Sequence, residues 1–118
     1  MPTFDHDRLD VYHVAIDFVA TADDVVENLP RGRSYLADQL QRAALSIPLN
    51  IAEGAGEFSG REKARFYRMA ARSATECAAI FDVCKRLEIG NVETLDSGRE
   101  LLLRIMSMLI KLAHVHSG

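Results

Sequence analysis

The chain has 118 residues, of which 48% are hydrophobic and 26% charged, and its formal net charge is −3. This length fits one domain, residues 1–118, and is sufficient to bury about two thirds of the surface of the unfolded chain. No apolar run approaches the ~20 residues of a membrane span, and the first residues are acidic, unlike those of a signal peptide. We therefore expect a cytoplasmic protein.

The first two predicted helices follow from apolar residues that recur with a period near 3.5. The first opens at Asp5 or Asp7 as its cap and stops before Pro30, while the second opens at Ser34 and ends at Gly54-Ala55-Gly56. The expected buried face of the first helix consists of Leu9, Tyr12, Ile16, Val19 and Val26. That of the second consists of Leu36, Leu40, Ala43, Ile47 and Asn50.

Pro48 lies inside the second predicted helix, among good helix formers. A proline in a helix interior removes one backbone hydrogen bond and pushes on the preceding turn, at a cost of about 3 kcal/mol. We therefore predict a bend at this residue.

The third predicted helix runs from Gly60 to Leu87, and Ser59 and Glu62 form the capping box S-x-x-E at its start. Its expected buried face is Phe66, Ala70, Ser73, Cys77, Ile80, Cys84 and Leu87. The fourth helix begins at about Thr94, and Gly98 is expected to weaken its first turns by up to about 1 kcal/mol. Its expected buried face is Leu95, Leu102, Ile105, Leu109, Leu112 and His116.

Short connections between these helices favour antiparallel neighbours, and the heptad spacing favours shallow crossing angles. The predicted fold is therefore all-α: an antiparallel up-down-up-down four-helix bundle with a proline bend in the second helix.

With the helices placed, the segment Gln41–Gly54 (QRAALSIPLNIAEG) resembles the R-R-A-x-x-S-I-P-x-N-I-A-E-G signature of the 23S rRNA intervening-sequence proteins. Gln41 stands where that family usually has arginine. The similarity extends to the opening Leu9–Tyr12 and covers roughly residues 9–112. Further matches in the third helix are Phe66, Ala70, Ser73 and Glu76, with Arg72 in place of the usual glycine.

This resemblance implies a four-helix protomer that assembles into a ring-shaped homopentamer, with no defining enzymatic activity. A related protein, the accessory variability determinant of diversity-generating retroelements, binds reverse transcriptase and nucleic acid. Membership therefore implies RNA, or a protein that processes nucleic acid, as a partner.

Charge is unevenly distributed: residues 1–30 contain one arginine and seven acidic residues, whereas residues 31–72 contain eight basic and four acidic ones. Within the basic part, a stripe occupies one face of the third predicted helix, since its members fall within ~60° of arc. The stripe consists of Arg61, Arg65, Arg68 and Arg72. Such a stripe can bind successive phosphates, with Lys63, Arg42 and Arg33 extending it and Tyr67 and Phe58 stacking on bases. The alternative is a solvated face, or ion pairs with the acidic first helix of the same or a neighbouring subunit.

Signature residues Ser46, Asn50 and Glu53 place polar groups around Pro48. They can meet a ligand or partner, but we favour a structural role. Ser46 and Asn50 would bond the carbonyls that the proline leaves without a donor. Glu53 would pair with an arginine of the third helix or reach a helix N-terminus. Glu76 is likewise expected to pair with an arginine such as Arg42.

The residues give little support for metal or nucleophilic chemistry. Di-iron bundles need Glu-x-x-His pairs, which are missing, and His114 and His116 point to different sides of a helix. Cys77 and Cys84 are seven residues apart on one helix, too far for a disulfide, and are expected to be buried thiols. We therefore expect no metal, no cofactor and no enzymatic activity.

The predicted function is an oligomeric scaffold that binds RNA through the arginine stripe. The alternative is a purely structural interaction module.

Overall fold

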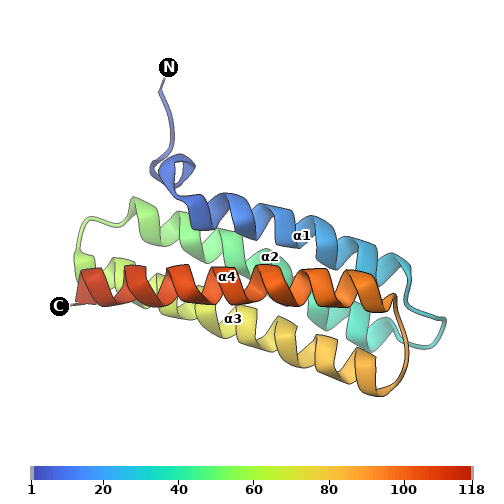
Figure 1. The fold of residues 1–118 in the computed structure, drawn as a ribbon. Helices are drawn as coiled ribbons and strands as arrows, with labels where there is room; N and C mark the ends of the chain where they lie inside the picture. The colour runs from blue at the N-terminus through green and yellow to red at the C-terminus, as the bar shows by residue number, and fades with distance from the viewer. Residues whose placement is uncertain (1, 118) are drawn as a thin grey trace.

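The computed structural model of the chain describes residues 2–117 and is all-helical over that range (Figure 1). A short 3₁₀ helix, η1 (Asp5–Arg8), precedes four α-helices. These are α1 (Asp10–Glu27), α2 (Ser34–Gly56), α3 (Gly60–Arg86) and α4 (Val92–Ser117). Figure 1 shows the four helices side by side, joined by short connections at alternating ends, so the predicted four-helix bundle is confirmed.

Each helix packs against two others. α1 contacts α2 and α4, and α3 contacts the same two helices, whereas the described residues show no backbone proximity between α1 and α3. The helices therefore stand at the corners of a square, with α1 diagonal to α3. No helix within residues 2–117 is both long and apolar enough to cross a membrane.

The helix ends are set by local hydrogen bonds. Ser59 accepts a bond from the Glu62 backbone N–H at 3.0 Å, as the capping box predicted, and Asn91 does the same for Thr94 at the start of α4. The other two predicted caps are wrong. Asp5 and Asp7 belong to η1, and Ser34 is already the first helical residue of α2.

The bundle core contains most of the residues expected in α2, α3 and α4, but α1 presents a different face from the one predicted. Its buried residues are Val11, Val14, Ala15, Phe18, Ala22 and Val25. Ile16, expected in the core, is 44% exposed, and Tyr12, Val19 and Val26 are only partly buried. The prediction failed because α1 carries two interleaved apolar sets, and the period alone does not say which set faces inward.

Corrections in the other helices are smaller. Leu87 is exposed beyond the end of α3. Five other residues expected in the core are half-buried at its edges: Asn50, Phe66, Ser73, Leu112 and His116. Gly98 is a packing residue, because a Cβ built on it would lie 2.5 Å from the Phe81 ring. Glycine at this position weakens the helix locally, but it allows α3 and α4 to approach closely.

Candidate functional site

The arginine stripe of α3 lies on the side of the helix that faces away from the core. All four members are exposed. Arg65 pairs with Glu62 on the same helix at 3.1 Å, and its guanidinium stacks over the Phe66 ring, 4.6 Å from the centroid. Arg61, Arg68 and Arg72 have no ion pair or side-chain hydrogen bond within residues 2–117.

The residues expected to extend the stripe are used elsewhere. Lys63 lies on the opposite side of α3, where its Nζ donates to the Ala55 carbonyl at 2.8 Å and so caps the C-terminal end of α2. Arg33, before α2, is half-buried and donates to the Tyr35 hydroxyl at 3.0 Å. Both were predicted as extensions because sequence proximity was taken for spatial proximity.

Of the two aromatic residues predicted to stack on bases, only Phe58 is accessible. Tyr67 is 2% exposed and belongs to the core, where burial raises the pKa of its hydroxyl. Phe58 is fully exposed in the loop between α2 and α3, one turn before Arg61.

Arg42 pairs with Glu76 across α2 and α3, as predicted, with Nη2 3.1 Å from Oε2. It also donates to Gln39 on its own helix. The arginine is therefore held at the seam between α2 and α3 rather than presented beside the stripe.

The same seam contains a second polar contact, formed by signature residues. The hydroxyls of Ser46 and Ser73 are 2.8 Å apart, and Asn50 Nδ2 donates to both the Ser46 hydroxyl and the Ser46 carbonyl at 2.9 Å. The expectation that Asn50 bonds a carbonyl left free by Pro48 is not met. The carbonyl opposite Pro48 is that of Ala44, four residues earlier, and Asn50 reaches Ser46 instead.

The α2 helix continues through Pro48 to Gly56. Glu53 is exposed and forms no ion pair with any described residue, so its predicted arginine partner on α3 is absent. Gly54 has a steric role, since a Cβ there would lie 2.9 Å from the Tyr67 ring and 3.0 Å from the Phe66 Cβ. It permits α2 and α3 to meet closely at their joined ends.

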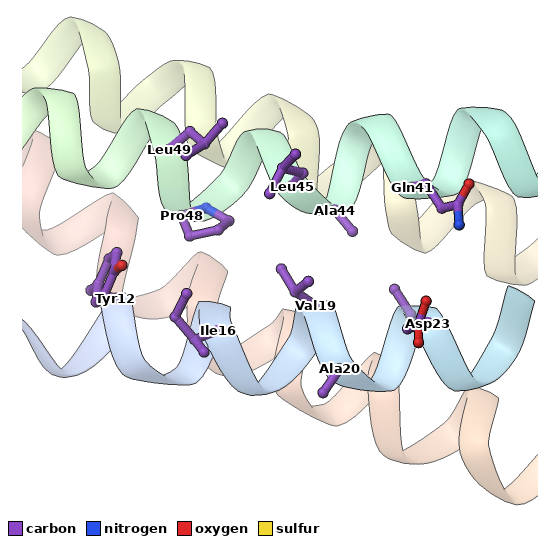
Figure 2. Close-up of a pocket in the computed structure, with 11 residues that line it drawn as sticks. Tyr12, Ile16, Val19, Ala20, Asp23, Gln41, Ala44, Leu45, Pro48 and Leu49 are labelled. Carbon is purple, nitrogen blue, oxygen red and sulfur yellow. The ribbon is translucent and has the colours of Figure 1, made fainter.

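An apolar groove of about 540 Å³ runs between α1 and α2, and it was not predicted. Figure 2 shows Ile16 and Val19 of α1 facing Ala44 and Pro48 of α2 across it. Tyr12 lies toward one end and Asp23 lies at the other (Figure 2). The signal that could have revealed it is the second apolar set of α1, which needs a partner other than the core.

Metal-ligating and thiol groups are isolated. Within residues 2–117 no three His, Cys, Asp or Glu side chains cluster in a way that could hold a metal ion. Cys77 and Cys84 are free and buried, as expected. Burial, with a smaller contribution from the Glu76 charge, raises the pKa of Cys77 to about 12, so this thiol stays protonated at neutral pH.

In a comparison with protein families, the family profile described as 23S rRNA-intervening sequence protein matches residues 7–111, which is most of the chain. A comparison with curated proteins found no match.

Proposed function

The chain belongs to the 23S rRNA-intervening sequence protein family, and from this premise we propose that it is a non-enzymatic, self-associating scaffold that binds RNA through the arginine stripe of α3. The observation that supports this most is that Arg61, Arg68 and Arg72 are exposed and unpaired in the described part of the chain. Guanidinium groups that the fold does not use are available for phosphate oxygens, which they bind in forked geometry.

One stripe offers few contacts, and the domain as a whole is acidic, so a single copy would bind RNA weakly. Self-association compensates for this. The family resemblance implies a ring of five copies. In such a ring the stripes repeat around the assembly, so each additional contact with one RNA becomes intramolecular. Exposed Phe58 adds a stacking surface next to Arg61. The family description is consistent with an RNA context and specifies no activity.

The test is RNA binding by nuclease-treated full-length chain carrying Arg61→Glu and Arg72→Glu. We expect affinity for a labelled single-stranded RNA, measured by fluorescence anisotropy at low salt, to fall at least tenfold. The salt dependence should also weaken, since each phosphate contact on a single strand contributes about 0.7 to the slope of log K against log salt.

The matched control is Arg104→Glu with Lys111→Glu on α4, two exposed residues without ion pairs among the described residues. It changes the net charge equally but leaves the stripe intact, so it should reduce affinity much less. Equal losses in the two variants, or no binding by the unmodified chain at low salt, would exclude the stripe as an RNA site.

A second candidate is a structural interaction module in which the stripe pairs with the acidic α1 of a neighbouring copy. It is favoured by the diagonal placement of α1 and α3, which keeps the stripe away from α1 within one chain. The two candidates differ in their response to salt. Light scattering at low and high salt should show a stable assembly if apolar contacts hold it, and a loosened one if the stripe does.

A further inference from the structure

A cleft of about 570 Å³ opens at one end of the bundle, between η1, the loop that joins α2 to α3, and the last turn of α4. Figure 1 shows that the start of α1, the end of α2, the start of α3 and the end of α4 all lie at this end. We call it the end cleft. Its volume is typical of pockets that hold small molecules, about 300–1,000 Å³. Its lining includes a buried tyrosine, two cations, a carboxylate and an exposed aromatic ring: Tyr67, Lys63, Arg8, Glu57 and Phe58.

The most buried polar residue of this lining has an unused hydrogen-bonding group. Tyr67 is 2% exposed, and its hydroxyl has no hydrogen-bond partner within residues 2–117. Inaccessible side-chain oxygens of the described buried residues all have partners, so this hydroxyl must reach a cavity. Tyr67 borders the end cleft and a smaller hollow between α3 and α4. Because helical side chains point back toward the start of their helix, where the end cleft lies, the hydroxyl is directed into the cleft.

Two cations supply further donors in the end cleft. Lys63 is half-buried, and its Nζ donates to the Ala55 carbonyl at 2.8 Å and to a neighbouring carbonyl at 3.4 Å. An ammonium group has three N–H donors, so one remains for a ligand. Arg8 contacts Asp5 at 3.4 Å, but both side chains are mostly exposed, and such a pair contributes too little to withhold the guanidinium from a phosphate. The cleft can therefore bind an anion with charge-assisted hydrogen bonds.

The loop between α2 and α3 adds two groups of a different kind. Glu57 is half-buried and forms no ion pair or side-chain hydrogen bond with any described residue, so its carboxylate is available as an acceptor. Phe58, the next residue, is fully exposed, and its ring can stack on a planar aromatic group. The end cleft thus combines donors for an anion, an acceptor for hydroxyl groups and an aromatic surface.

A nucleotide requires these three kinds of group, and we propose that the end cleft binds one nucleotide. The phosphate lies between Lys63, Arg8 and the Tyr67 hydroxyl. The ribose hydroxyls donate to Glu57, and the base stacks on Phe58. The nucleotide is either free or the 3′-terminal one of an RNA strand, since both present a base, two ribose hydroxyls and a 5′ phosphate group. This site goes beyond the arginine stripe, none of whose members lines the cleft.

The test is binding of adenosine 5′-monophosphate (AMP) to the nuclease-treated full-length chain, measured by saturation-transfer NMR. The unmodified chain should bind AMP, and Tyr67→Phe, which removes only the hydroxyl, should weaken binding about tenfold. Tyr35→Phe is the matched control, because Tyr35 lies at the other end of α2, about 30 Å away, and it should bind AMP normally. Absence of AMP binding by the unmodified chain, or equal binding by Tyr67→Phe, would overturn the proposal.

A second variant tests the ribose contact without a change in the core. Glu57→Gln should weaken AMP binding about fivefold, because a neutral amide is a weaker acceptor than a carboxylate. It should not weaken binding of the 2′,3′-dideoxy analogue of AMP, which has no ribose hydroxyl to donate. A merely structural role of Glu57 would change the affinity for both ligands equally, and that result would overturn the ribose contact. Circular dichroism checks that each variant is folded.

The Arg61→Glu, Arg72→Glu chain separates the end cleft from the RNA proposal. It should bind AMP as the unmodified chain does, even where it loses RNA. Loss of AMP binding in this chain would overturn the independence of the cleft, whereas unchanged RNA affinity would overturn only the role of the stripe.

The same chain identifies the source of the nucleotide. A trinucleotide with a free 3′ end should displace AMP if the cleft takes the end of an RNA strand, and should leave AMP bound if the cleft takes a free nucleotide. The trinucleotide with a 3′ phosphate is the control, because its terminal ribose hydroxyls are blocked. Equal displacement by both trinucleotides would overturn the contact between Glu57 and the ribose.

Discussion

The two sides of α2 are packed in different ways. Toward α3, the seam is closed by small residues and by side-chain hydrogen bonds, with Ser46 bonded to Ser73 and Arg42 paired with Glu76. Toward α1, the seam opens into an apolar groove at which Leu45 and Leu49 remain exposed. One segment of fourteen residues, Gln41–Gly54, supplies both sides.

This difference separates two kinds of residue within a single sequence motif. Residues on the α3 side have their bonding partners inside the domain, so they contribute to the stability of the fold. Residues on the α1 side leave apolar side chains exposed, which is typical of an interaction surface. Substitutions at the closed seam should therefore change the free energy of unfolding of the monomer. Substitutions at the open seam should instead change the assembly.

The largest effect is expected where the closed seam is tightest. Gly54→Ala should lower the free energy of unfolding by about 1–3 kcal/mol, because the added methyl meets Tyr67 and Phe66 at 3.0 Å or less. Gly56→Ala is the matched control two residues away, with nothing within 4 Å of its new Cβ. It should be neutral or stabilise by up to about 1 kcal/mol. Chemical denaturation of both variants measures the contrast, and equal effects would show that α2 and α3 are less closely packed here.

A somewhat smaller effect is expected from the hydrogen bonds of the same seam. Ser46→Ala removes the contacts to Ser73 and to the Asn50 side chain, and should cost about 1–2 kcal/mol of unfolding free energy. A double-mutant cycle with Ser73→Ala isolates the hydroxyl pair, for which a coupling of at least about 0.5 kcal/mol is expected. Thr75→Ala, which removes an exposed bond to its own helix, serves as the control. Zero coupling in the cycle would mean that the serines are solvated independently.

The smallest effect is expected from the burial of Cys77 in the bundle interior beside this seam. The pKa of Cys77 is raised to about 12 in the folded chain, against an ordinary value of 9.0. The unfolded thiol therefore ionises first, so its contribution to stability is complete below pH 9 and is lost between pH 9 and 12. At pH 10 the loss should be about 1 kcal/mol, by the relation of 1.36 kcal/mol per pH unit.

Comparison of the unfolding free energies at pH 8 and pH 10 tests this, with Cys77→Ala as the variant that lacks the thiol. The variant should lose less stability between the two pH values than the unmodified chain. Identical losses would show that water reaches Cys77 in the folded state.

The fold could be predicted from sequence because helix periodicity, capping and short loops all indicate the same architecture. Ser59 and Glu62 begin α3 as expected, and Gly54–Gly56 end α2. The pairing of Arg42 with Glu76 was also predictable, because antiparallel neighbours bring opposite charges at matching heights together.

The inward face of α1 could not be predicted, because Phe18 and Ile16 are equally apolar and only the positions of α2 and α4 decide between them. The same limit applies to the site. Lys63 is close to the arginine stripe in sequence, yet helical rotation places it against the end of α2. The groove depends on the relative positions of two helices, which no property of either helix specifies alone.

The diagonal arrangement of α1 and α3 also gives the domain a transverse electric dipole. α1 carries five acidic residues and no lysine or arginine, whereas α3 carries seven basic residues and three acidic ones. In the field of a polyanion such a domain experiences a torque, so α3 turns toward the polymer before contact. The orientation of the domain is thus selected before contact, at separations within the Debye length of roughly 10 Å in 0.1 M salt.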